Sequence, residues 1–372
     1  CLSQNSEMSK QIINQNDPVL IGLLIPDKSH DPDIRYLAKS IQDAAHLAKK
    51  DLKNSNLKIQ VYSTSGEPQS ALKAVNIAIE DGVQIIIGPL FSDETKAIAN
   101  ITRTANLKVF SFSNQESIAG KNIFTLGTTF QNISDRIIKF SKQKGYSHFG
   151  IVSPNTPEYS VNVTEISKSI SENNANLSLN ISYSNEHGNA ARLAPEIRRQ
   201  VIHKKIQTIL FLETPNKNIG LIAAEFERFE QADYLEDFRF IGLTRWDTNN
   251  YILSSKALQG GWFSIPDQRL IKKFESRFRR VYGYRPHLKS GLGYDAIAAL
   301  GALLQKAKME NKLDPFSKRR ILDPSGFLGV NGIFRFNSNQ TAEKGMAIAE
   351  VDQGRYRIID PAPVSFINKS KP

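Results

Sequence analysis

Cysteine is nearly absent from this chain of 372 residues, which has only Cys1. A single cysteine excludes a disulfide within the chain and a zinc site built from paired cysteines. Long apolar runs are also missing. The most hydrophobic stretches, 19–25 and 83–87, have the length of strands, well short of the ~18 residues that a membrane-spanning helix needs. We therefore expect neither a disulfide-stabilised fold nor a membrane span.

The signatures of several enzyme classes are missing too. The patterns GxxxxGK[ST], HExxH and GxSxG, typical of phosphate-binding loops, zinc proteases and serine hydrolases, do not occur. The six histidines, at positions 30, 46, 148, 187, 203 and 287, show no spacing typical of metal ligands. No cysteine other than Cys1 could act as a nucleophile. We therefore predict a protein that is not an enzyme and has neither a metal site nor a cofactor.

One stretch, 291–296, formally matches the dinucleotide-binding fingerprint GxGxxA. That fingerprint requires a strand directly before it, because its glycines turn the chain from the strand into a helix at the pyrophosphate. Pro286 lies where this strand would run, and proline disfavours a central strand. We interpret the two glycines as positions where helices pack closely.

The composition is that of a globular protein, with 40% hydrophobic and 23% charged residues. Lysine and arginine number 48 against 37 aspartates and glutamates, so the formal net charge is +11. The basic clusters fall mostly within helical patterns, and we interpret them as solvated helix faces. A surface for anionic lipid, cell-wall polymer or a partner is the alternative. No basic stretch is interleaved with stacking aromatic residues, so nucleic acid is not a predicted partner.

Short apolar runs alternate with amphipathic stretches through most of the chain. This alternation predicts right-handed βαβ units around parallel sheets. It occurs twice, over about 17–126 and 127–258, which predicts an α/β fold with two doubly wound parallel-sheet lobes and a cleft between them. Three further helices and a β-rich end follow. The predicted strands are 19–25, 57–62, 83–87, 109–113, 149–153, 177–183, 208–212, 238–242, 332–336, 346–351 and 355–359.

Polar side chains follow the strands of both predicted sheets, at the edge where open α/β sheets bind ligands. After the strand 83–87, Ser92 or Asp93 is expected to cap the next helix, and ligand binding at the free N–H groups is the alternative role. The candidate cleft residues are Ser92, Ser113, Asn114 and Gln115 from the first lobe and Tyr159, Glu213, Thr244 and Trp246 from the second.

Ordered motifs give the chain a family resemblance over about residues 17–360. They are IIIGPL at 85–90, VFS at 109–111, Tyr159, GYDA at 293–296 and GVNGIFRF at 329–336. In these motifs the chain resembles the type I periplasmic binding proteins, the leucine/isoleucine/valine-receptor family. Within that fold it is most similar to the penicillin-binding-protein activator lipoproteins of alphaproteobacteria, in Trp246-Asp247, LQGGWF at 258–263, PSGF at 324–327 and DPAP at 360–363.

The resemblance implies two lobes that are joined by three crossings, near residues 126, 260 and 328, and that close around a ligand. The lobes expected from it are 17–126 with 261–327, and 127–260 with 328–360. A tether at 1–16 and a tail at 361–372 complete the expected organisation.

The resemblance also implies roles for some of the candidate cleft residues. In amino-acid receptors the positions of Ser92, 113–115 and Tyr159 contact the ligand carboxylate and backbone atoms. Thr244 departs from those receptors, which place there an acidic residue that pairs with the ligand ammonium. The missing charge-assisted hydrogen bond is worth about 1.5–3 kcal/mol. We therefore expect leucine, isoleucine and valine to bind with dissociation constants weaker than about 100 μM.

Cys1 is a candidate lipidation site, because bacterial lipoproteins are cut just before the cysteine that carries their lipids. The polar stretch that follows, up to Asn16, fits a flexible tether. The expected location is then the periplasm, with a lipid anchor in an envelope membrane, the outer one being favoured. The alternative is that residue 1 is an arbitrary boundary.

Two functions from different classes remain open. The first is a lipid-anchored regulator of peptidoglycan synthesis, whose partner would be a peptidoglycan synthase. The second is a substrate-binding receptor that hands an amino acid or another small polar solute to an ABC permease. Either would hold its small polar ligand, if it has one, in the cleft between the lobes.

Overall fold

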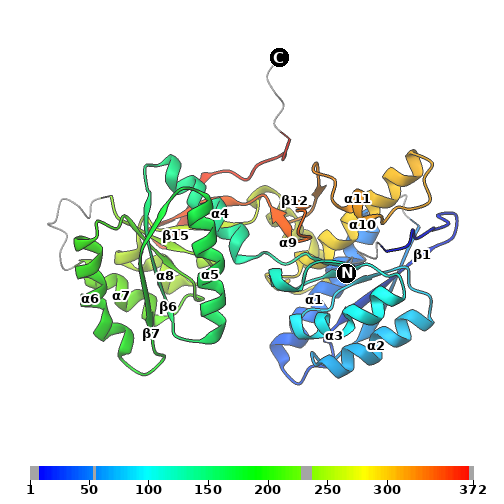
Figure 1. Ribbon diagram of the computed structural model, residues 1–372, viewed down its shortest axis with the longest axis horizontal. Coiled ribbons are helices and arrows are strands. Elements are labelled where there is room, and N and C mark those ends of the chain that lie inside the picture. The colour runs from blue at the N-terminus through cyan, green and yellow to red at the C-terminus, as the bar shows by residue number, and fades with distance from the viewer. Residues whose placement is uncertain (1–7, 53–55, 228–236, 368–372) are drawn as a thin grey trace, which may run out of the picture. The chain divides into compact units, whose positions relative to one another are not determined.

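The computed structural model describes residues 8–52, 56–227 and 237–367. The chain divides into two compact units (Figure 1). Unit 1 comprises residues 1–129, 267–345 and 363–372, and unit 2 comprises residues 130–266 and 346–362. No helix in the described ranges has the length and apolar character that crossing a bilayer would require.

Unit 1 is built on a parallel five-stranded sheet. Its strands are β1 (Val19–Ile25), β2 (Leu57–Ser63), β3 (Ile85–Ile87), β4 (Val109–Ser111) and β5 (Ile123–Thr125). Their order is β2-β1-β3-β4-β5. A small antiparallel sheet also belongs to this unit and consists of β11 (Phe327–Leu328), β12 (Ile333–Phe336) and β13 (Ala342–Lys344).

Helices cover both faces of this five-stranded sheet. They are α1 (Pro32–Asp51), α2 (Pro68–Glu80), α3 (Ser92–Thr104), α10 (Gly291–Met309) and the short α11 (Lys318–Ile321). Helix α9 (Gln268–Tyr282) packs against α1 in a separate cluster, through residues such as Phe274 and Leu47. Helices α1 and α10 share one core with the sheet, through residues such as Ile41 and Ala296. Helices α2 and α3 form a second core through Val75 and Ile98. Both faces of the sheet are therefore buried, as expected of a parallel sheet.

Unit 2 is built on a mixed sheet of seven described strands. These are β6 (His148–Pro154), β7 (Asn176–Tyr183), β8 (Thr208–Phe211), β9 (Arg239–Gly242), β10 (Trp262–Ile265), β14 (Ala347–Asp352) and β15 (Arg355–Asp360). Their order is β15-β14-β10-β9-β8-β6-β7. The strands from β7 to β10 are parallel, and β14 and β15 pair antiparallel.

The helices of unit 2 are α4 (Phe130–Gln143), α5 (Pro157–Glu172), α6 (Asn189–His203), α7 (Lys217–Glu227) and α8 (Asn250–Ser254). Helices α4 and α5 share a core with the sheet through Ile137 and Ile166. Helices α6 and α7 share a different core through Ile197 and Ile222. Helices therefore cover both faces of this sheet as well, and each unit is one of the two predicted α/β lobes.

The unit boundaries differ from the expected lobes in three segments. Residues 127–129, expected in the second lobe, belong to unit 1, and residues 261–266, expected in the first lobe, belong to unit 2, where they contribute strand β10. Residues 328–345 were placed with the second lobe, but they belong to unit 1. The reason is that Phe334, Phe336 and Ala342 are buried in the core that α1 and α10 form with the sheet. Within the expected tail, 361–362 lies in unit 2 and the rest in unit 1.

The expected tether is also shorter than predicted. Ile13 is 1% exposed in the core of unit 1, and its N–H donates to the Leu313 carbonyl at 2.7 Å. The chain is therefore anchored to the fold from Ile13 onward. Cys1, the candidate lipidation site, lies outside the described residues.

Candidate functional site

Three of the predicted cleft residues gather at one edge of the sheet of unit 2. Strand β8 lies between β6 and β9 in parallel register, so the carboxyl ends of these strands meet at the same edge. Tyr159 lies in the first turn of α5, just after β6, while Glu213 follows β8 and Thr244 follows β9. The Thr244 hydroxyl donates to the Glu213 backbone carbonyl at 3.2 Å.

Glu213 is the most unusual side chain at this edge. It is 4% exposed, and its Oε1 atom is buried without a hydrogen-bond partner. Its other oxygen, Oε2, accepts from the Asn216 amide. No ion pair to Glu213 occurs in the part of the chain that the structure describes. Burial raises the pKa of Glu213 to about 7, against an opposing contribution from the Asn216 hydrogen bond.

Asn216 holds the Glu213 carboxylate in place. Its side-chain oxygen accepts from the backbone N–H groups of Asn218 at 2.8 Å and Ile219 at 3.3 Å, so it caps the start of α7. Its amide group is thereby directed to Glu213. The sequence analysis missed this residue, although an asparagine just before an amphipathic helix is a recognisable capping signal.

Tyr159 lies within electrostatic reach of the same carboxylate. Its side chain is partly buried against the core of unit 2. Burial raises the pKa of Tyr159, and the nearby Glu213 and Glu158 carboxylates raise it further. The phenol is therefore a hydrogen-bond donor at neutral pH. We call Tyr159, Glu213, Asn216 and Thr244 the Glu213 cluster.

One expectation about a neighbouring residue is wrong. Trp246 was placed in the cleft, but it is 0% exposed and lies in the core with Phe211 and Phe263. Gly242 makes room for its ring, because a Cβ at this glycine would lie 2.2 Å from the indole. Next to Trp246, Asp247 accepts two hydrogen bonds from the Arg245 guanidinium, each at 2.7 Å. The pair is neutral overall.

In unit 1 the structure places Ser92 at the start of α3, as its first residue. The expected cap at Ser92 or Asp93 is wrong, because the N-cap is Phe91. The Glu94 carboxylate accepts from the Phe91 N–H at 3.4 Å and from the Thr64 hydroxyl at 2.7 Å, and so replaces a capping side chain. The Ser92 side chain is therefore not used as the cap.

The other candidates of unit 1 follow β4, beside the start of α3. A hydrogen bond of 2.7 Å connects the hydroxyl groups of Thr95 in α3 and Ser111 in β4. The Phe112 N–H donates to the backbone carbonyl of Pro89 at 3.1 Å. Ser113 is buried, and its Oγ accepts from the Gln115 N–H at 3.1 Å. Asn114 and Gln115 are exposed. The Ser92 and Ser113 segments therefore lie at one edge of this sheet.

These two edges differ in chemistry. The edge of unit 1 offers hydroxyl groups, amides and the N–H groups at the start of α3, which suit a carboxylate or another acceptor. The edge of unit 2 offers a buried carboxylate oxygen with unused acceptor capacity. Within the described ranges, no group of three or more histidine, cysteine, aspartate or glutamate side chains could hold a metal ion.

Comparisons with known proteins agree with the predicted fold. A family model described as periplasmic binding protein matches residues 18–355. Among curated proteins, an uncharacterized protein of Rickettsia prowazekii is 22% identical over 215 residues. The match covers 56% of each chain, so it spans just over half of that relative.

Solved structures share the fold over nearly the whole chain. A putative branched-chain amino acid ABC transporter protein from Rhodospirillum rubrum is 16% identical with a TM-score of 0.77, covering 92% of this chain and 100% of its own. A substrate-binding protein from Desulfitobacterium hafniense, in complex with Leu, is 17% identical with a TM-score of 0.65. The match covers 92% of this chain and 100% of that protein.

A solute-binding protein from R. palustris, in complex with benzoate, is 13% identical with a TM-score of 0.58, covering 93% of this chain and 97% of its own. At these identities the structures show a common fold and no common ligand. The predicted type I fold, with two α/β lobes, is confirmed. Together with the family match over most of its length, this fold shows that the chain belongs to the periplasmic binding proteins, a non-enzymatic family.

Proposed function

We propose that this protein is a substrate-binding receptor for a small polar solute that carries an amine, with an ABC permease as its partner. The observation that carries the proposal is Glu213, a buried carboxylate whose Oε1 atom has no hydrogen-bond partner. A buried acceptor without a partner costs free energy, which a ligand that donates a hydrogen bond would recover. An ammonium group would supply both the donor and the opposite charge.

Glu213 also offers a replacement for the acidic residue that is missing at Thr244. Amino-acid receptors of this family have an acidic residue at the position of Thr244, and its absence argued against an amino acid as ligand. The Thr244 hydroxyl is bonded to the backbone of Glu213, so the two positions are adjacent. We infer that Glu213 takes over the pairing with the ligand amine from the neighbouring strand.

The remaining candidates fit the other groups of such a solute. Tyr159 carries a phenol that can donate to a ligand oxygen. In unit 1, Ser92, Ser113, Asn114 and Gln115 remain the predicted contacts for a ligand carboxylate. Trp246 is not among the proposed ligand contacts, because its ring is buried in the core.

Two structures of the same fold support the choice of a receptor. The Desulfitobacterium hafniense protein was solved with Leu and the R. palustris protein with benzoate. A regulator of peptidoglycan synthesis, suggested by the similarity to penicillin-binding-protein activators, finds no support among these relatives. A lipid anchor at Cys1 is a separate proposal. Cys1→Ser in the precursor should release the protein from membranes, and unchanged partitioning would contradict the anchor.

Thermal unfolding with a panel of solutes tests the receptor proposal. The panel would contain the twenty amino acids, simple primary amines, benzoate and 4-hydroxybenzoate. A true ligand at 100 times its dissociation constant stabilises the fold by about 2.7 kcal/mol. We expect a rise in Tm with at least one amine-bearing solute. The absence of any shift would contradict the proposal and favour a regulator without a solute. A shift with benzoate-type acids alone would also contradict it, because it would indicate a receptor for acids without an amine.

A further inference from the structure

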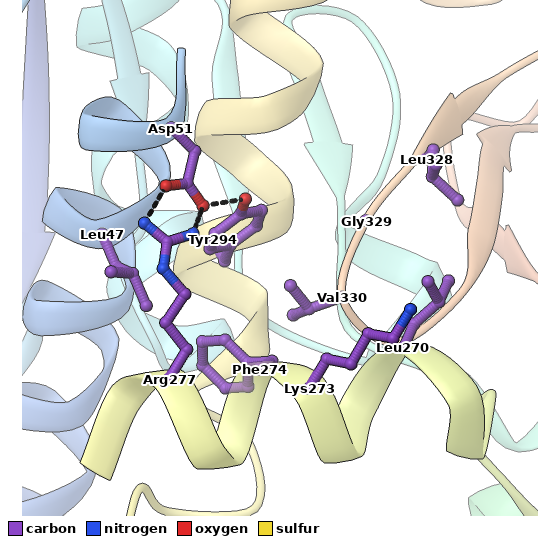
Figure 2. A pocket seen from close by; sticks show the side chains of 10 residues that line it. All are labelled: Leu47, Asp51, Leu270, Lys273, Phe274, Arg277, Tyr294, Leu328, Gly329 and Val330. Carbon is purple, nitrogen blue, oxygen red and sulfur yellow. Dashed lines mark hydrogen bonds and ion pairs between the residues drawn. The ribbon is translucent and has the colours of Figure 1, made fainter. Parts of the chain in front are cut away.

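A cavity lies in unit 1, whereas the Glu213 cluster belongs to unit 2. The cavity is lined by residues of α1, α9, α10 and the segment after β11 and has a volume of about 260 Å³ (Figure 2). Its apolar lining consists of Leu47, Leu270, Phe274, Leu328 and Val330. We call it the α9 pocket.

The α9 pocket has rigid walls. On one side the Asp51 carboxylate accepts from the Arg277 guanidinium and, at 2.6 Å, from the Tyr294 hydroxyl, as Figure 2 shows. On the other side Asp295 is buried and accepts from the Val330 N–H at 2.7 Å. Gly329 lies directly over Asp295, because a Cβ there would lie 2.1 Å from Oδ1 of the carboxylate. Two hydrogen-bonded carboxylates therefore fix the shape of the pocket.

The charge around the pocket is strongly positive. Helix α9 carries six lysine or arginine residues against one carboxylate, Glu275. Arg269 and Arg277 are engaged by Asp267 and Asp51. Lys273, at the pocket rim, makes no ion pair with any described residue, and Figure 2 shows its side chain extending away from Asp51. Lys272, Arg279 and Arg280 are exposed on the same helix.

Two observations decide what would occupy the pocket. Its volume lies below the roughly 300–1,000 Å³ of typical small-molecule pockets, which favours a single side chain as occupant. Arg280 lies seven residues after Lys273, two turns further along the same side of α9, and is also exposed. A small ligand in the pocket would leave Arg280 unused, whereas an extended acidic segment would pair with both cations. Leu328, 62% exposed at the rim, adds apolar surface for an anchor side chain.

We propose that the α9 pocket is a docking site for an acidic segment of a partner protein, which inserts one aliphatic or aromatic side chain between Phe274, Val330 and Leu328. The acidic residues next to this anchor pair with Lys273 and Arg280 on the same side of α9. The buried anchor supplies most of the affinity, and the charges set the orientation and the rate of association.

Fluorescence anisotropy with labelled peptides tests this proposal on the full chain. The probes are Glu-Glu-Asp-X-Asp-Glu-Glu heptapeptides in which X is leucine, isoleucine, phenylalanine or tryptophan. At low salt we expect at least one of them to bind with a dissociation constant below about 100 μM. The peptide with serine at X should bind at least about tenfold more weakly, because it cannot bury an anchor.

Surface variants locate the binding. Lys273→Glu and Leu328→Asp should each weaken binding of the best peptide by about fivefold or more, and both residues are exposed, so the fold should tolerate them. Lys308→Glu is the charge-matched control, since Lys308 is exposed and lies fourteen residues beyond Tyr294, about 21 Å further along α10. It should change the affinity by less than about twofold.

Four results would overturn the proposal. The first is that no apolar-anchored acidic peptide binds below about 1 mM. The second is equal binding of the serine peptide, which would show charge attraction alone. The third is equal effects of Lys273→Glu and Lys308→Glu. The fourth is binding of hexanoate as tight as that of the best peptide, which would make the pocket a site for small acids.

Discussion

At the scale of single residues, Glu213 controls both the proposed ligand binding and a pH dependence of stability. Its pKa is raised from 4.5 to about 7 by burial. Between these values the folded protein holds a proton that the unfolded chain releases. The stability that this proton contributes is fully present below about pH 4.5 and is lost as the pH rises through about 7. The loss amounts to about 3 kcal/mol in the absence of ligand.

Glu213→Gln should remove this loss, because a neutral amide does not titrate. We expect the free energy of unfolding of the ligand-free variant to exceed that of the wild type by about 2–3 kcal/mol more at pH 8 than at pH 5. Urea unfolding at both pH values measures this difference. Glu158→Gln, at an exposed carboxylate of the same sheet edge, is the matched control and should show no such effect. Parallel pH profiles for wild type and Glu213→Gln would contradict the burial of an ionisable Glu213.

At the scale of elements, the close packing of α1 on α10 depends on Gly293. A Cβ at Gly293 would lie 2.3 Å from the backbone carbonyl oxygen of Ile41, and a backbone atom cannot move aside as a side chain can. This contact confirms close helix packing at Gly293. The same interpretation is wrong for Gly291, where a Cβ would instead meet the side chains of Asn331 and Val330 in the segment after β11. The strand that a dinucleotide-binding loop requires is absent before the GxGxxA stretch, since residues 284–290 are described and form none.

Gly293→Ala should therefore destabilise the protein by about 1–3 kcal/mol, although alanine favours helix. Gly220→Ala in α7 is the matched control. Its Cβ would meet the ring end of Tyr251, a side chain that is 54% exposed and free to shift. The control should be neutral or slightly stabilising in urea unfolding. Equal effects of the two substitutions would contradict the claim that the backbone contact at Gly293 sets the distance between α1 and α10.

Most helices and strands were predictable because their apolar periodicity is strong, as in β1 and α1. Strands β5, β10, β11 and β13, of two to four residues each, were missed, since such short segments carry little periodic signal. The gathering of Tyr159, Glu213 and Thr244 was predictable from parallel strands ending at one edge. The burial of Trp246 was not, because it depends on the space that Gly242 leaves on a neighbouring strand.

At the scale of the whole molecule, each unit is assembled from segments distant in the sequence. Unit 1 needs residues 267–345 in addition to 1–129, and unit 2 needs 346–362 in addition to 130–266. The sequence predicted this interleaving through the family resemblance, but it placed the last boundary at 328. The true division near 345 depends on the packing of β12 and β13, which no local pattern reveals.

A fragment that ends at residue 266 should consequently fail to fold. It would expose the apolar face of α1, including Leu37, Ile41 and Ala45, which α10 covers in the intact chain. We expect the fragment to show no cooperative unfolding transition by circular dichroism, whereas residues 8–367 should show one. A cooperative transition in the fragment would mean that the first segment folds without α10.

Titration calorimetry on wild type and Glu213→Gln is the most direct test of the central claim, that Glu213 pairs with the amine of a small solute. We predict that the best amine-bearing solute binds the wild type with a dissociation constant of about 10 μM or tighter at pH 8. The affinity should fall about tenfold at pH 6, where Glu213 is mostly protonated, and at least about tenfold in Glu213→Gln. Glu158→Gln should bind as the wild type does. Binding that is unchanged by pH and by Glu213→Gln, or no binding of any amine, would contradict the account.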